Sequence, residues 1–237
     1  MERGPGAPVL SVWRSEEKYL LEHPQAIRLK DKLSRLLTPD EFGPEGYRVR
    51  SLYFDSFHNN DYYEKDAGVY RRKKIRLRIY DEAQPTAKLE LKEKQGDLQH
   101  KSSLVVSRAE AESICRGDYG FLLDRRGDTA LRLYTLLTLG LYRPVAVIEY
   151  DRTAYTHPLF STRLTFDSRV RTSEYNLDLY DPNLPWEYVL EQEVLLEVKY
   201  NQVLPKPVSK VLDHENLNRI SVSKYAAGRT VLNDWIF

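Results

Sequence analysis

The chain has 237 residues, of which 30% are charged and 41% hydrophobic, a composition typical of a globular protein rather than a disordered one. Its single cysteine, Cys115, excludes an intrachain disulfide and a cysteine metal cage. The formal net charge of +1 conceals a basic cluster, RRKKIRLR at 71–78, which indicates a local anion site more than a general nucleic-acid-binding surface.

The hydropathy of the chain predicts a soluble protein. The first ten residues, MERGPGAPVL, lack the long apolar core of a signal peptide. No run of about 18 apolar residues is present, and the most apolar region, 131–148, is interrupted by Arg132 and Arg143. We therefore expect a protein of a reducing compartment, with no transmembrane segment in this chain and a cytoplasmic location.

Strand and helix signals alternate irregularly along the first half of the chain. A strand at 12–21 precedes an amphipathic helix at 24–37, which Thr38 and Pro39 end. A strand at 47–55 and a short helical segment at 59–66 follow. Three further strands are predicted at 74–80, 88–94 and 101–106.

The second half begins with helices and then returns to strands. Ser107 and Glu110 form a capping box before a helix that ends near Gly117, and an amphipathic helix follows at 128–139. Strands are predicted at 145–154, 162–171 and 194–200, with a weakly signalled strand at 177–180 and helices at 205–216 and 221–232. This order lacks the regular strand–helix alternation of a parallel sheet, so we expect one antiparallel α+β domain over 1–237.

Charged side chains recur on one face of at least five predicted strands. Successive side chains of a strand point to opposite faces, so residues two apart share a face. The charged sets are Arg14, Glu16 and Lys18; Lys74, Arg76 and Arg78; Lys88, Glu90, Lys92 and Lys94; Arg163 and Asp167; and Glu193, Glu197 and Lys199. The opposite faces are largely apolar and must be covered.

Two interpretations of this pattern are open. The ordinary one is a half-exposed sheet whose charged face lies in water. The other is a closed barrel that confines the charges, which requires mutual pairing, water and a polyanionic ligand. Arg and Lys with a few Glu suit phosphates together with a metal ion, whereas a nucleic-acid groove would need facing aromatics and few acids. The pattern alone does not decide between them.

Eight short motifs follow one another in a recognisable order. They are RSEEKY at 14–19, SLYFDS at 51–56, RKKIRLR at 72–78, LELKEK at 89–94, EYDRTAY at 149–155, RLTFD at 163–167, LEVK at 196–199 and SKY at 223–225. Together they resemble the catalytic domain of the vacuolar transporter chaperone (VTC) family of polyphosphate polymerases, which belongs to the triphosphate tunnel metalloenzymes. Each motif alone is weak, whereas eight in order are specific, and they cover about 10–232.

The resemblance implies a fold and a set of site residues. The fold would be a closed antiparallel β-barrel of about eight strands with helices packed outside and a tunnel that binds triphosphate. The implied catalytic cations are Arg76, Arg78, Lys92, Arg152, Arg163 and Lys224. The further phosphate-binding residues are Lys18, Lys74, Lys94 and Lys199. Glu197 is the main implied ligand of Mn²⁺ or Mg²⁺, with Glu90 and Glu16 as further ligands.

Some of these residues have a structural alternative. For Glu16 and Lys199 the alternative is a salt bridge within the barrel. We expect the run 71–73 at the tunnel mouth or in solvent, and structural roles for Tyr53 and Asp55. Most of the 17 tyrosines are expected to pack the barrel.

The implied activity is transfer of the ATP γ-phosphoryl group to a polyphosphate chain, with ADP released. The implied ligands are ATP and polyphosphate, and no nucleic acid. The alternatives are a metal-dependent triphosphatase or polyphosphate hydrolase of the same fold, or a non-catalytic polyphosphate-binding protein. Eukaryotic family members carry an inositol-phosphate-sensing domain and a membrane segment, so we expect this to be a stand-alone prokaryotic form. Whether a partner protein places the chain at the inner face of a membrane is left open.

Overall fold

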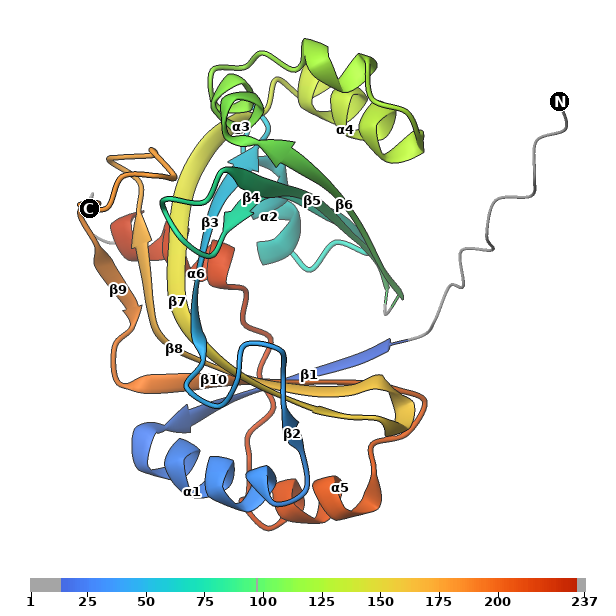
Figure 1. Cartoon of the computed structure of the whole chain (residues 1–237), viewed down its shortest axis with the longest axis vertical. Helices are drawn as coiled ribbons and strands as arrows, with labels where there is room; N and C mark the ends of the chain where they lie inside the picture. The colour runs from blue at the N-terminus through green and yellow to red at the C-terminus, as the bar shows by residue number, and fades with distance from the viewer. Residues whose placement is uncertain (1–13, 97, 234–237) are drawn as a thin grey trace, which may run out of the picture.

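One antiparallel sheet of ten strands forms the centre of the structure (Figure 1). The structure is a computed structural model that describes residues 14–96 and 98–233, without the side chains of residues 14, 232 and 233. The strands are β1 (Arg14–Glu22), β2 (Thr38–Pro39), β3 (Tyr47–Asp55), β4 (Arg71–Ile79), β5 (Thr86–Gln95), β6 (Leu98–Ser107), β7 (Arg143–His157), β8 (Thr162–Ser173), β9 (Glu187–Leu190) and β10 (Glu193–Asn201). Their main order is β1-β10-β8-β7-β3-β4-β5-β6, while β2 pairs with β7 and β9 with β8.

Helices cover the apolar side of this sheet at both ends (Figure 1). The helices are α1 (His23–Ser34), α2 (Asn60–Asp66), α3 (Arg108–Cys115), α4 (Asp128–Leu139), α5 (Lys206–Asp213) and α6 (Lys224–Asn233). Of these, α1, α3, α4 and α5 lie on the apolar side, whereas Tyr62 of α2 and Tyr225 of α6 pack with Tyr53 and Tyr150 on the other face. Helices α3 and α4 lie over β5 and β6, whereas α1 lies against β1, β10 and α5. No helix in the described part of the chain is long and apolar enough to cross a membrane.

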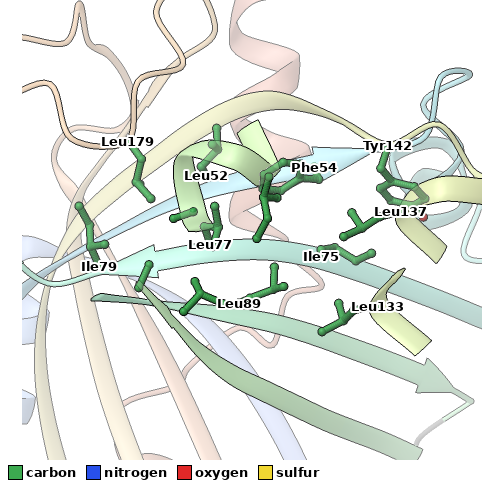
Figure 2. Close-up of a cluster of buried hydrophobic side chains, with 14 of the residues drawn as sticks. Leu52, Phe54, Ile75, Leu77, Ile79, Leu89, Leu133, Leu137, Tyr142 and Leu179 are labelled. Atoms are coloured by element: carbon green, nitrogen blue, oxygen red, sulfur yellow. The ribbon is translucent and has the colours of Figure 1, made fainter. Parts of the chain in front are cut away.

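The apolar faces predicted from strand alternation form two large hydrophobic clusters. In the cluster shown in Figure 2, Leu52, Ile75 and Leu89 of β3, β4 and β5 pack against Leu133 and Leu137 of α4. In the second cluster, apolar residues of β8 and β10 pack against α1 and α5, and its members include Leu29, Leu33, Leu164, Phe166, Leu196, Val198, Val208 and Leu212. The charged faces of the same strands therefore lie on the opposite side of the sheet.

Strong curvature brings the two ends of the sheet toward each other. The hydrogen-bonded path of the described residues runs from β1 to β6, and these two outer strands are not paired with each other. Side chains nevertheless bridge the space, because Lys92 Nζ of β5 lies 3.1 Å from Glu16 Oε2 of β1. The curved antiparallel sheet, with α1, α3, α4 and α5 outside it, thus encloses the charged faces, as the resemblance implied.

Most predicted elements are present within a few residues of the expected bounds, including the capping box at Ser107 and Glu110. The first two residues of the predicted strand at 12–21 lie outside the described residues. The prediction of a strand at 177–180 was wrong, because β9 forms at Glu187–Leu190 instead. Asn176 Oδ1 accepts the N–H of Asp178, and Asp178 Oδ1 accepts that of Tyr180, so side chains take the donors that a strand would use.

Candidate functional site

Two neighbouring cavities lie on the charged side of the sheet. The large cavity has a volume of about 620 Å³, and its described lining contains ten Lys or Arg side chains but only two carboxylates, Glu16 and Glu197. The small cavity has a volume of about 230 Å³, and its described lining contains eight Lys or Arg side chains and one carboxylate, that of Glu16. Both are lined by Glu16, Lys18, Lys74, Lys92, Gln99 and Ser223, so they adjoin along one shared wall.

All but two of the site residues predicted from the sequence line the large cavity. These are Glu16, Lys18, Lys74, Arg76, Arg78, Lys92, Arg152, Arg163, Glu197, Lys199 and Lys224. Lys94 lines the small cavity, where Arg72 and Lys73 join it from the basic run of β4. Glu90 is among the lining residues of neither cavity, although its carboxylate contacts residues that are.

Cross-strand pairing aligns the acidic and basic side chains of the first wall. β10 lies between β1 and β8, so Glu197 is directly opposite Lys18 on one side and Thr165 on the other. Asp167 of β8 is opposite Arg152 of β7 and accepts two hydrogen bonds of 2.7 Å from its guanidinium group. The alternation of charged and apolar residues thus becomes a layer of ion pairs.

Lys224 joins Asp167 and Glu197 into one network. Its Nζ lies 2.6 Å from Asp167 Oδ2 and 3.1 Å from Glu197 Oε1, and Lys199 Nζ lies 2.8 Å from Glu197 Oε2. Burial alone would raise the pKa of Glu197, but Lys199, Lys224 and Lys18 outweigh it and hold that pKa well below its ordinary value. We call Arg152, Asp167, Glu197, Lys199 and Lys224 the paired network.

Helix α6 delivers Lys224 to this position. Ser223 Oγ accepts the N–H of Ala226 at 3.3 Å and so caps the first turn of the helix. Gly228 allows α6 to approach the sheet, because a Cβ at this position would lie 2.4 Å from Ile148 Cδ1. The C-terminal helix therefore supplies part of the cavity wall.

Glu16 lies at the junction of the two cavities. Its carboxylate is 3.3 Å from Lys18 Nζ and 3.1 Å from Lys92 Nζ. Burial would raise the pKa of Glu16, but Lys199, Lys92 and Lys18 lower it to about 2. Burial in turn lowers the pKa of Lys92 to about 8, although Glu16 opposes that shift. The salt bridge weighed as an alternative for Glu16 is therefore present.

Glu90 acts as a buried counter-ion to the arginines of β4. Arg76 is opposite Glu90 in the β4–β5 pair and donates to Glu90 Oε2 at 2.7 Å, while an Arg78 nitrogen lies 3.8 Å from the same oxygen. Lys101 of β6, a residue that the sequence analysis did not select, contacts the other carboxylate oxygen. Burial would raise the pKa of Glu90, but these cations outweigh it and lower the pKa.

Three tyrosines that the sequence analysis assigned to packing line the large cavity. The Tyr53 hydroxyl accepts a hydrogen bond of 2.8 Å from Arg76, and its ring stacks on Tyr225 with centroids 5.2 Å apart. The Tyr150 ring lies 5.1 Å from Arg152 and 4.8 Å from Lys224. Strand parity could have indicated one of them, because Tyr150 shares a face with Arg152, a residue that the sequence analysis did select.

Asp55 has the structural role expected for it. Its carboxylate accepts the backbone N–H groups of Ser56, Asp61 and Tyr62, and Tyr225 also donates to it. These bonds satisfy free N–H groups at the start of α2. Asp55 therefore holds α2 and α6 against β3 without lining either cavity.

The curved antiparallel sheet around a cation-lined cavity is the fold of the triphosphate tunnel proteins. Within that class, the chain belongs to the VTC domain family, whose sequence profile matches residues 13–233. No curated protein matches the chain.

Solved structures of the same fold are distant in sequence. A proposed adenylate cyclase from Bacillus halodurans has a TM-score of 0.53 at 13% identity, covering 89% of this chain and 95% of its own. A proposed adenylyl cyclase from Hippeastrum, with a dominant triphosphatase activity, has a TM-score of 0.53 at 16% identity. The match covers 91% of this chain and 94% of the Hippeastrum chain. A proposed adenylate cyclase from Vibrio parahaemolyticus has a TM-score of 0.50 at 11% identity, and the match covers 92% of this chain and 98% of the Vibrio chain. At these identities the likeness shows the fold alone.

Proposed function

We propose that this protein is a polyphosphate polymerase that transfers the γ-phosphoryl group of ATP to a growing polyphosphate chain and releases ADP. The observation that carries the proposal is the shared wall of the two cavities, which continues the cation-lined space beyond the large cavity. A triphosphate needs one such cavity, whereas a growing polyanion also needs a basic path away from the reacting phosphate. Membership of the VTC domain family supports the same function.

The side chains of the large cavity suit phosphoryl transfer without a protein nucleophile. The acceptor is already an anionic phosphate oxygen, so catalysis rests on in-line positioning and charge stabilisation. Arg76 and Arg152 are each held by a carboxylate, Glu90 or Asp167, and both line the large cavity. Guanidinium groups suit the binding of phosphate oxygens. Cations fixed in advance stabilise the charge of the transition state without further reorganisation.

The donor set of the large cavity fits a divalent metal ion. Glu16 and Glu197 line the same cavity, lie 3.3 and 3.5 Å from the shared Lys18 Nζ, and both have a pKa lowered by the surrounding lysines. No group of three or more His, Cys, Asp or Glu suited to a metal exists among the described residues, so phosphate oxygens would complete the coordination. We propose that these two carboxylates hold Mn²⁺ or Mg²⁺, which would neutralise phosphate charge there.

A triphosphatase is the second candidate function. The dominant triphosphatase activity of the Hippeastrum protein favours it. The two functions use the same cations and differ in the acceptor, which is water for the triphosphatase and a phosphate chain for the polymerase. The length of the product therefore distinguishes them.

The test is incubation of the purified chain with ATP, a short polyphosphate primer and Mn²⁺ or Mg²⁺, with products resolved by chain length. We expect ADP and polyphosphate longer than the primer. Release of phosphate and ADP alone would support the triphosphatase and overturn the polymerase. Tight, salt-sensitive binding of polyphosphate with no turnover would instead identify a binding protein.

Variants assign the activity to the cavity. Glu197→Ala, and Arg76→Ala combined with Arg78→Ala, should each abolish chain extension. Glu193→Ala is the matched control, because Glu193 is on the same strand but lines neither cavity. Equal loss of activity in the control variant would point to a general folding defect.

A further inference from the structure

Lys74 differs from the other lysines of the large cavity in having no carboxylate partner among the described residues. Its Nζ donates to Ser223 Oγ at 2.6 Å, an oxygen that also accepts the N–H of Ala226. The remaining lysines of this cavity all lie within 3.5 Å of a Glu or Asp oxygen, namely Lys18, Lys92, Lys101, Lys199 and Lys224. Among the described lysines of the large cavity, Lys74 is therefore the one that no carboxylate compensates.

Glu16 lines the same two cavities as Lys74 but pairs with Lys18 and Lys92, and the charged groups that most affect Lys74 are four cations. They are Lys18 of β1, Arg76 of β4, Lys92 of β5 and Lys65 of α2, with Ser223 and the Tyr225 ring completing the surroundings. Burial lowers the pKa of Lys74 well below its ordinary value, and these four cations lower it further. Each unit of that shift gives about tenfold more unprotonated amine near neutral pH.

An unprotonated amine is a nucleophile, and the cations beside it attract phosphate groups. Lys74 lines both cavities and is half-buried, so a small molecule in either cavity can reach it. A reagent that carries a phosphate next to an electrophilic carbonyl carbon would satisfy both features at once. Acyl phosphates are the simplest compounds of this class.

We propose that Lys74 is a modification site at which small acyl phosphates, such as acetyl phosphate, acylate the side-chain amine. The lone pair of Nζ forms a bond to the carbonyl carbon, and the bond from that carbon to the phosphate oxygen breaks. Inorganic phosphate leaves with the bonding electrons, and the proton of the nitrogen passes to solvent. The product is a neutral amide that carries no cationic charge.

Acylation would remove a cation from the wall that the two cavities share. Polyanions would then bind more weakly, so acyl phosphate would lower the activity of the protein. This consequence rests on the proposed function, whereas the reactivity of Lys74 does not. The site of acylation and the loss of activity can therefore be measured separately.

The experiment treats the full chain with acetyl phosphate near neutral pH and maps acetylated lysines by peptide mass spectrometry over time. We expect Lys74 to react at least about tenfold faster than Lys199 and Lys224, whose amines are each paired with the carboxylate of Glu197. Tripolyphosphate should slow the reaction at Lys74 by occupying the cavities. Equal rates at the three lysines, or no protection by tripolyphosphate, would overturn the proposal.

Lys30 provides a matched control outside the cavities. Burial lowers its pKa as well, but it lines neither cavity. A neutral reagent, acetic anhydride, should modify both Lys30 and Lys74, whereas acetyl phosphate should favour Lys74. Acetylation of both at similar rates by acetyl phosphate would show that no anion site recruits the reagent. Selective acetylation of Lys74 in a protein that makes no polyphosphate would overturn the proposed function and leave this inference standing.

Discussion

The paired network and Lys74 both contribute side chains to the large cavity, but they differ in whether a carboxylate neutralises the positive charge. In the network, Arg152 and Lys224 are compensated by Asp167 and Glu197. Lys74 has only a hydroxyl partner among the described residues. Compensated cations contribute to a fixed wall whether or not a ligand is present. An uncompensated cation lowers its free energy when an anion binds.

The largest expected effect follows from breaking the paired network. Asp167 is fully buried between Arg152 and Lys224, so Asp167→Asn leaves the buried Arg152 without its carboxylate and Lys224 with Glu197 alone. We expect the free energy of unfolding, measured with urea, to fall by about 3–5 kcal/mol.

The control for this experiment is an exposed ion pair. Asp151 and Arg169 pair at the surface, where Asp151→Asn should cost less than about 1 kcal/mol. Equal losses in the two variants would show that burial does not distinguish the paired network from a surface pair.

A smaller and opposite effect is expected for Lys74. Lys74→Met keeps the approximate length of the side chain and removes a charge on which the four cations Lys18, Lys92, Lys65 and Arg76 have the largest electrostatic effect. The free energy of unfolding without ligand should not fall, whereas the affinity for tripolyphosphate should drop by about tenfold, the size of one charge-assisted contact. Calorimetric titration with tripolyphosphate measures this affinity.

Lys30→Met is the matched variant for Lys74→Met. It removes a half-buried lysine that lines neither cavity, so the affinity for tripolyphosphate should stay unchanged. If Lys74→Met destabilised the protein without weakening this affinity, Lys74 would belong with the paired network.

Strand parity predicted most of the fold and most of the cavity wall. The sets around Lys18, Arg76, Lys92 and Glu197 share a face because alternation in a strand is local, and the apolar residues between them locate the core. The resemblance, rather than the parity, implied which ligand the charges would bind. Which acidic side chain pairs with which basic one depends on the order of the strands in the sheet. The alternation within a single strand gives no information about that order.

The residues that were missed depend on contacts between distant segments. Asp167 was seen in its motif, but its role as the carboxylate of Arg152 and Lys224 needs β7, β8 and α6 together. The isolation of Lys74 is likewise invisible in the sequence, where Lys73 beside it does have a partner, Asp61. Whether a charged side chain has a partner of opposite charge therefore depends on the tertiary structure.

The smallest expected effect comes from a pair intermediate between the two cases. Lys73 lines the small cavity and lies 2.9 Å from the buried Asp61, which also accepts a hydrogen bond from Tyr142. Burial raises the pKa of Asp61 to about 6, against the opposing effect of Lys73. As the pH falls through that value, the carboxyl gains a proton and Lys73 loses its counter-ion.

Asp61→Asn imitates the protonated carboxyl at every pH. At neutral pH the variant should bind tripolyphosphate about twofold to fivefold more tightly than the wild type, the size of one partly screened charge. The two proteins should converge as the pH falls below about 6, because Asp61 of the wild type is then neutral too. Tripolyphosphate itself titrates in this range, so the measured quantity is the ratio of the two affinities at each pH. A ratio that does not change with pH would mean that Lys73 behaves like the cations of the paired network. Its charge would then be neutralised by the protein whether or not tripolyphosphate is bound.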